Sequence, residues 1–180
     1  MFLGQAYTFI SYNEADKIRK QIGSALVFRG LSKGDMIGIS SQNTAEWTLL
    51  GLGCDTQSMT MVPLYDTLGE EGVKFILNQT ELTVLFAHPK TLSRYLSYLP
   101  VTKSVKLLVK LPSPKDREST PEETRAAAEN QVDLMTWDQF VQTGINNPVD
   151  PNYPTPDDIA TLCYTSGQYN WLSFRLSIST

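Results

Sequence analysis

Short apolar runs alternate with amphipathic segments along most of this chain, and the alternation limits what it can fold into. The runs have the length and composition of β-strands, and we expect strands at 36–39, 60–64, 82–87, 105–111 and 159–165. Between them, apolar residues recur at helical spacing. Strands that alternate with helices form βαβ units, so we predict an α/β fold with a mostly parallel sheet flanked by helices.

Local signals place the ends of several helices. Ser11 and Glu14 have capping-box spacing, which predicts a helix that ends near Gly30. Thr67 and Glu70 repeat this spacing and predict a helix whose apolar stripe is Val73, Ile76 and Leu77. Residues 7–11 are expected to form a short strand before the first helix, and 91–99 another helix.

A helix from Asn43, its expected cap, to Asp55 should turn Trp47 toward the core. Gly51 and Gly53 lower its intrinsic stability, so we expect them to allow close packing of the helix on the sheet.

Two later segments break the rhythm. Residues 112–131 are rich in proline and charge, and we interpret them as a charged surface insertion with a short helix at 122–130. Residues 146–156 contain four prolines and are expected to be an extended linker. The tail from Leu172 alternates apolar and polar residues, which is compatible with an edge strand or with an accidental sequence such as intron read-through; we favour the accident.

Composition excludes several classes of function. A net charge of −4 over 180 residues gives no electrostatic basis for binding nucleic acid. Cys54 and Cys163 lie far apart in apolar segments and are expected to be reduced core thiols, while His88, the single histidine, is expected to follow a strand rather than bind metal; no metal site is predicted. The sequence has no apolar run near the ~20 residues of a membrane span. Its start does not resemble a signal peptide, so a cytoplasmic protein is expected.

The last expected strand ends in Tyr164, Thr165, Ser166 and Gly167. Small hydroxylated residues and a glycine could open a tight turn at the carboxyl end of the strand. Such a turn can direct N–H groups and hydroxyls at a phosphate. An ordinary strand-to-turn junction also explains this tetrapeptide, and on the spacing alone we favour it.

Three segments together carry a resemblance to a known family. They are 41–47 (Ser-Gln-Asn-Thr-Ala-Glu-Trp), 62–69 (Val-Pro-Leu-Tyr-Asp-Thr-Leu-Gly) and 157–167 (Asp-Asp-Ile-Ala-Thr-Leu-Cys-Tyr-Thr-Ser-Gly). In this order and spacing they resemble the amino-terminal domain of long-chain-fatty-acid–CoA ligases, a branch of the adenylate-forming (AMP-binding) superfamily. The likeness implies a partial AMP-binding domain over 1–167, truncated within the phosphate loop and followed by a tail at 168–180 outside the family pattern.

The resemblance implies a reaction and its reagents. The family joins a long-chain fatty acid to coenzyme A, using ATP and Mg²⁺ and passing through an acyl-adenylate. Its phosphate loop resembles Tyr-Thr-Ser-Gly-Thr-Thr-Gly-x-Pro-Lys-Gly, of which this chain matches the tetrapeptide 164–167 alone, as a remnant of the ATP site. Gln168, Tyr169 and Asn170 depart from the pattern, and the loop lysine has no counterpart. We therefore expect no complete catalytic set, no productive binding of ATP, Mg²⁺ or coenzyme A, and no activity of this chain alone.

Two other hypotheses remain open. The chain could be a non-catalytic interaction or regulatory module that binds an intact synthetase, or the product of a mis-predicted gene. The family works at the endoplasmic reticulum, mitochondrial outer membrane, peroxisome or lipid droplet, in part by peripheral membrane association. Structural roles are expected for residues 65–67 in the turn after a strand, and for Asp157 and Asp158 as solvent-exposed turn residues.

Overall fold

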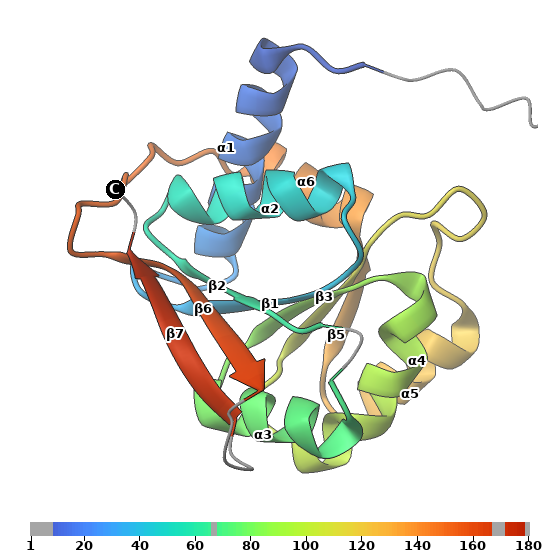
Figure 1. Cartoon of the computed structure of the whole chain (residues 1–180). Coiled ribbons are helices and arrows are strands. Elements are labelled where there is room, and N and C mark those ends of the chain that lie inside the picture. Colours follow the sequence, from blue (N-terminus) through green and yellow to red (C-terminus); the bar gives the residue numbers. More distant parts are fainter. Residues whose placement is uncertain (1–8, 66–67, 167–171, 179–180) are drawn as a thin grey trace, which may run out of the picture.

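The computed structural model describes residues 9–65, 68–166 and 172–178, and for 165, 166 and 172–178 it describes the main chain alone. Within these ranges the strands form one sheet, in the order β5-β4-β3-β1-β2-β6-β7 (Figure 1). The strands are β1 (Met36–Ser40), β2 (Thr60–Pro63), β3 (Val84–Ala87), β4 (Leu107–Lys110), β5 (Asp133–Thr136), β6 (Ile159–Ser166) and β7 (Leu172–Ile178). The helices are α1 (Tyr12–Phe28), α2 (Ala45–Asp55), α3 (Glu70–Thr80), α4 (Pro89–Tyr98), α5 (Pro121–Glu129) and α6 (Trp137–Asn146), with a short 3₁₀ helix at Leu99–Val101.

The predicted α/β class is confirmed. Neighbouring strands from β5 to β6 run parallel, and β7 alone pairs antiparallel, with β6. The tail from Leu172, for which an edge strand was one of two interpretations, therefore forms the last strand of the sheet. Because the other strands share one direction, their carboxyl ends meet at one edge, which we call the carboxyl edge, and their starts at the opposite amino edge.

Helices cover both faces of the sheet (Figure 1). On one face α1, α2 and α6 enclose a core that includes Ile22, Leu50 and Phe140, all fully buried. On the other face α3, α4 and α5 cover a second core around Ile76 and Leu92. Strands β1 to β4 are almost completely buried between the helix layers, which explains their nearly continuous apolar sequences, whereas β5 and β6 are partly exposed.

The start of α1 follows the prediction, whereas the strand expected before it is wrong. Ser11 accepts a hydrogen bond from the Glu14 amide, and the Glu14 carboxylate accepts one from the Ser11 amide. Gly30 follows the helix with a φ of +90°, a conformation that suits glycine. Residues 9–11 are not a strand, because Ser11 is occupied as the helix cap; residues 7 and 8 lie outside the described residues.

Two other helix starts differ from expectation. Helix α2 is capped by Thr44 rather than Asn43, since the Trp47 amide donates to the Thr44 hydroxyl at 3.4 Å. Helix α3 begins at Glu70 after Gly69, which makes no side-chain cap, so Glu70 is its first residue instead of the third that a Thr67 capping box requires. Thr67 and Asp66 lie outside the described residues.

The glycines of α2 have different neighbours. A β-carbon on Gly51 would lie 3.5 Å from the sulfur of Met61 on β2, an ordinary contact between helix and sheet. A β-carbon on Gly53 would overlap Ile22 of α1. The expected helix-on-sheet contact is therefore wrong for Gly53, whose missing side chain lets two helices approach each other.

The two segments that break the rhythm are both held by polar contacts. Helix α5 confirms the short helix expected at 122–130, and Thr120 caps it with Glu123 in a capping box. After α6, residues 147–158 carry the chain across the molecule from β5 to β6. The Asn152 amide donates to the Thr56 carbonyl and the Ser58 hydroxyl donates to the Asn152 carbonyl, each at 2.7 Å. This connection, which we call the strap, delivers β6 to the outer side of β2.

Candidate functional site

The carboxyl edge is where parallel sheets bind ligands, and the predicted phosphate-loop remnant lies at its β6 end. Hydrogen bonds order this edge at its centre. The His88 amide donates to the carbonyl of Ser40, at the end of β1, at 2.8 Å. His88 also caps α4 by accepting a hydrogen bond from the Lys90 amide at its Nδ1, so the expectation that it follows a strand is confirmed. The Leu64 amide donates to the Ile39 carbonyl and ties the end of β2 to β1.

Tyr164 is a buried residue of the core beneath α3. Its hydroxyl donates to Gln79 Oε1 at 2.7 Å, and burial raises the pKa of this phenol. The hydrogen bond ties the end of β6 to the last turns of α3. The described contacts of Tyr164 therefore position β6 in the sheet.

The next residues continue the strand instead of opening a turn. Thr165 and Ser166 belong to β6, and their main chains pair with Ser173 and Leu172 of β7. The expected tight turn at Thr165 and Ser166 is therefore wrong, because pairing with β7 keeps the chain extended. Gly167 lies outside the described residues.

Tyr65, which follows β2, and Cys163 of β6 lie close together near the carboxyl edge. The Tyr65 hydroxyl lies 3.9 Å from the Cys163 sulfur, and its ring is half exposed. Burial, and then the contact with Cys163, raises the pKa of Tyr65. Both cysteines are free thiols as expected, but Cys163 is only half-buried, whereas Cys54 of α2 is buried in the core that α1, α2 and α6 enclose. Trp47 of α2 packs against the same core, as predicted.

The two acidic residues before β6 have unlike environments. Asp157 is exposed, as expected. The expectation is wrong for Asp158, whose carboxylate accepts hydrogen bonds from the amide and hydroxyl of Thr155 and from Lys33. These partners, Lys33 first, lower the pKa of Asp158 to about 2.

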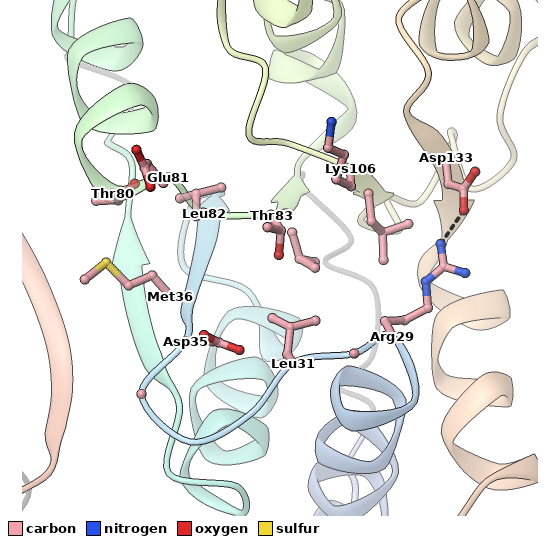
Figure 2. A pocket seen from close by; sticks show the side chains of 14 residues that line it. Arg29, Leu31, Asp35, Met36, Thr80, Glu81, Leu82, Thr83, Lys106 and Asp133 are labelled. Atoms are coloured by element: carbon pink, nitrogen blue, oxygen red, sulfur yellow. Dashed lines mark hydrogen bonds and ion pairs between the residues drawn. The ribbon is translucent and has the colours of Figure 1, made fainter.

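A hollow of about 610 Å³ opens at the amino edge, away from the predicted site (Figure 2). Its walls carry both signs of charge, from Asp35, Glu81 and Asp133 and from Arg29 and Lys106. At one side Arg29 forms an ion pair with Asp133 at 2.5 Å, which ties the end of α1 to the start of β5. The hollow lies where the strands begin, whereas a phosphate loop follows the end of a strand. It is therefore separate from the predicted site.

The sequence analysis missed a buried charge cluster at the carboxyl end of β4. Lys110 is fully buried, and its ammonium lies 2.6 Å from Asp116 Oδ1 and 2.9 Å from Glu123 Oε2. It also donates to the Glu118 carbonyl at 2.7 Å. The sequence did contain a signal for this cluster: Lys110 ends an apolar strand, and the segment that follows is rich in acidic residues.

In the parts of the chain that the structure describes, histidine, cysteine and acidic side chains do not gather in a group of three or more that could hold a metal ion. Among the same residues, every helix is too short or too polar to cross a membrane.

Comparison with known proteins defines the class. Residues 2–167 match the family model described as AMP-binding enzyme, and the chain belongs to this family. Among solved structures, it resembles the adenylation domain of a carboxylate reductase from Mycobacterium chelonae, with a TM-score of 0.79 and 20% identity over 95% of this chain and 28% of that one. The corresponding didomain from Segniliparus rugosus, solved in complex with AMP, gives a TM-score of 0.78 at 20% identity, over 96% of this chain and 26% of that one. At these identities the likeness shows the fold.

The curated relatives include long-chain acyl-CoA synthetases. The chain is 37% identical over 163 residues to the peroxisomal long chain acyl-CoA synthetase 7 of Arabidopsis thaliana, covering 89% of this chain and 22% of that enzyme. It is 36% identical to fatty acyl-CoA synthetase A of Dictyostelium discoideum (89% and 23%) and 32% identical to human long-chain-fatty-acid–CoA ligase 1 (91% and 23%). The chain thus spans less than a quarter of the length of these relatives.

Proposed function

We propose that these residues are the amino-terminal part of a long-chain fatty acid–CoA ligase and that the 180 residues alone do not catalyse its reaction. The reaction proposed for a complete enzyme joins a long-chain fatty acid to coenzyme A at the expense of ATP, in the presence of Mg²⁺. The identity to long chain acyl-CoA synthetases supports this substrate class.

The proposed inactivity is based on the carboxyl end of β6, where the chain pairs with β7. Phosphoryl and adenylyl transfer need N–H donors and cations around the reacting phosphates, because negative charge builds up there. The main chains of Thr165 and Ser166 lie in the ladder with β7, and the sequence contains no lysine after Lys115. The described residues do not fit a triphosphate at this place, so we derive no catalytic step through ATP.

Two measurements on the 180-residue chain test the proposal. In a thioesterification assay with palmitate, ATP, Mg²⁺ and coenzyme A, we expect no product above background, with a full-length long-chain acyl-CoA synthetase as the positive control. Calorimetry with Mg·ATP should show no heat of binding. Turnover, or tight magnesium-dependent nucleotide binding, would overturn the inactivity.

A second candidate function is a non-catalytic module that associates with an intact synthetase. One observation favours it: β7 pairs with β6 from Ile159 to Ser166. The last family strand is therefore not an open edge, as a non-catalytic module that folds by itself requires. Co-purification of the tagged chain with a full-length homologue from the same cell tests it, and a clean failure to associate argues against it. Sequencing the transcript across the codon for Gly167 tests the mis-predicted gene product, because a frame that continues with the family loop would identify an ordinary synthetase.

A further inference from the structure

The segment between β4 and α5 has little apolar material to hold it in place. From Pro112 to Thr120 none of the residues is buried. The segment nevertheless has a defined path, because Ser113 and Asp116 exchange two main-chain hydrogen bonds at 3.1 and 3.2 Å. Arg117 pairs with Asp138 of α6 at 3.1 Å, but both side chains are more than half exposed. An exposed pair of this kind contributes little to stability.

The fully buried Lys110 side chain holds this segment through polar contacts inside the fold. Its ammonium has three N–H donors, and three groups accept them: the Asp116 carboxylate, the Glu118 carbonyl and the Glu123 carboxylate. Burial by itself lowers the pKa of Lys110, but the hydrogen bonds and charges of Asp116 and Glu123 outweigh it and raise this pKa. The ammonium therefore stays charged and fully bonded inside the fold.

The three acceptors come from two different parts of the segment. Asp116 and Glu118 belong to the loop at 113–118, whereas Glu123 lies in α5. The Glu123 carboxylate also accepts a hydrogen bond from the Thr120 amide at 2.8 Å and so caps α5. One ammonium thus joins the carboxyl end of β4 to the loop and to the first turn of the helix.

The loop in turn forms one wall of an open hollow at the carboxyl edge. Ser113 to Asp116 face His88, Pro89 and Lys90 at the start of α4 across a volume of about 450 Å³. The position of this wall depends on Asp116, which Lys110 holds.

We propose that Lys110 is a latch: it fixes the 113–118 loop as the wall of this hollow, and the loop opens as a unit separate from the sheet when the latch is removed. Without Lys110, the Asp116 carboxylate, which is 44% exposed, loses the cation that draws it inward and can turn to water. Removal of an acidic partner instead leaves the fully buried Lys110 ammonium with less compensation, which is strongly destabilising. The loop has no apolar anchor of its own, so it belongs to the low-stability part of the structure that opens locally. This inference does not depend on the proposed enzymatic role.

The test compares Lys110→Met with Lys106→Met in the full 180-residue chain. Lys106 is exposed and lies just before the same strand, so its variant controls for the loss of a lysine near β4. Hydrogen exchange at the Ser113 and Asp116 amides should become about tenfold faster or more in Lys110→Met, as expected for local opening, while β1 and β3 keep their protection. Trypsin should cleave after Lys115 and Arg117 sooner in Lys110→Met than in Lys106→Met.

Unchanged exchange in the loop, or an equal loss of protection across β1 and β3, would overturn the latch. Asp116→Asn and Glu123→Gln keep the inference testable if Lys110→Met does not fold. Asp116→Asn should release the loop alone, and Glu123→Gln should also speed exchange in the first turn of α5. If neither variant changes exchange in its segment, the proposal fails.

Discussion

The ammonium of Lys33 lies 2.7 Å from the Asp158 carboxylate and joins two segments that are 125 residues apart in the sequence. Lys33 is in the turn before β1, and Asp158 directly precedes β6. The pair fixes the starts of two strands that are separated in the sheet by β2. It therefore helps to set the position of the last family strand.

This pair predicts an acid-dependent loss of stability. The pKa of Asp158 is lowered from 3.8 to about 2 in the folded chain, so its contribution is present above pH 3.8 and is lost as the pH falls toward 2. Asp158→Asn should be less stable than the original chain at neutral pH, and the difference should shrink between pH 4 and pH 2. Urea unfolding at several pH values measures it. Asp157→Asn, which changes the exposed neighbour, is the control and should leave the pH profile unchanged.

The glycines of α2 predict opposite effects of one substitution. Gly51→Ala should raise the free energy of unfolding by about 0.5–1 kcal/mol, because alanine favours the helix and the new methyl group meets ordinary contacts. Gly53→Ala should lower it by about 1–3 kcal/mol, because the methyl group would overlap Ile22 of α1. Thermal and urea unfolding of the two variants provide the comparison. Equal effects would contradict the close approach of α1 and α2.

The cysteines should differ in reactivity toward iodoacetamide. Burial raises the pKa of the Cys54 thiol, so this residue has neither the thiolate nor the access that alkylation requires. Cys163 is half-buried and should be alkylated first in the folded chain. Mass spectrometry of the modified peptides checks the order. Cys163→Ser should leave one slow thiol that reacts fast only in denaturant, and rapid labelling of Cys54 in the native chain would refute the expected order.

Tyr164 should behave as a residue of the core. Tyr164→Phe removes the hydrogen bond to Gln79 and should cost about 0.5–1.5 kcal/mol of stability. Tyr164→Ala also removes the buried ring and should cost about 3–5 kcal/mol. Urea unfolding measures both. A loss below about 1 kcal/mol for the alanine variant would mean that the ring does not support the sheet.

Signals within a few residues of one another predicted much of the fold. The capping box of Ser11 and Glu14 depends on residues three apart, and it forms as the spacing indicates. The same spacing at Thr67 and Glu70 gave a wrong prediction, since α3 begins at Glu70 after Gly69. Spacing alone does not show where a helix must begin in order to pack on the sheet. Alternation of strands and helices was sufficient for the parallel sheet, since the central strands β1 to β4 are buried on both faces and have apolar sequences that stand out.

Contacts between distant segments could not be read from the pattern. Ile22 and Gly53 are adjacent because two helices share one face, and the sequence gives no measure of their separation. For the candidate site, the tetrapeptide at 164–167 begins at the carboxyl end of β6, but its sequence did not show that the Tyr164 side chain is buried in the core. Its use as a remnant of an ATP site stays a prediction, as do the domain limits at 167 and the charged surface insertion at 112–131.

The strap has a consequence for how the chain is built on the ribosome. Thr60 of β2 donates its hydroxyl to the Ile159 carbonyl of β6, and these residues are 99 positions apart. Strand β2 therefore leaves the exit tunnel long before the strand that borders it, and its outer side stays vacant throughout that interval. A nascent chain paused before residue 147 presents an unpaired apolar strand, and chaperones that recognise such strands should bind it until β6 has emerged behind the strap.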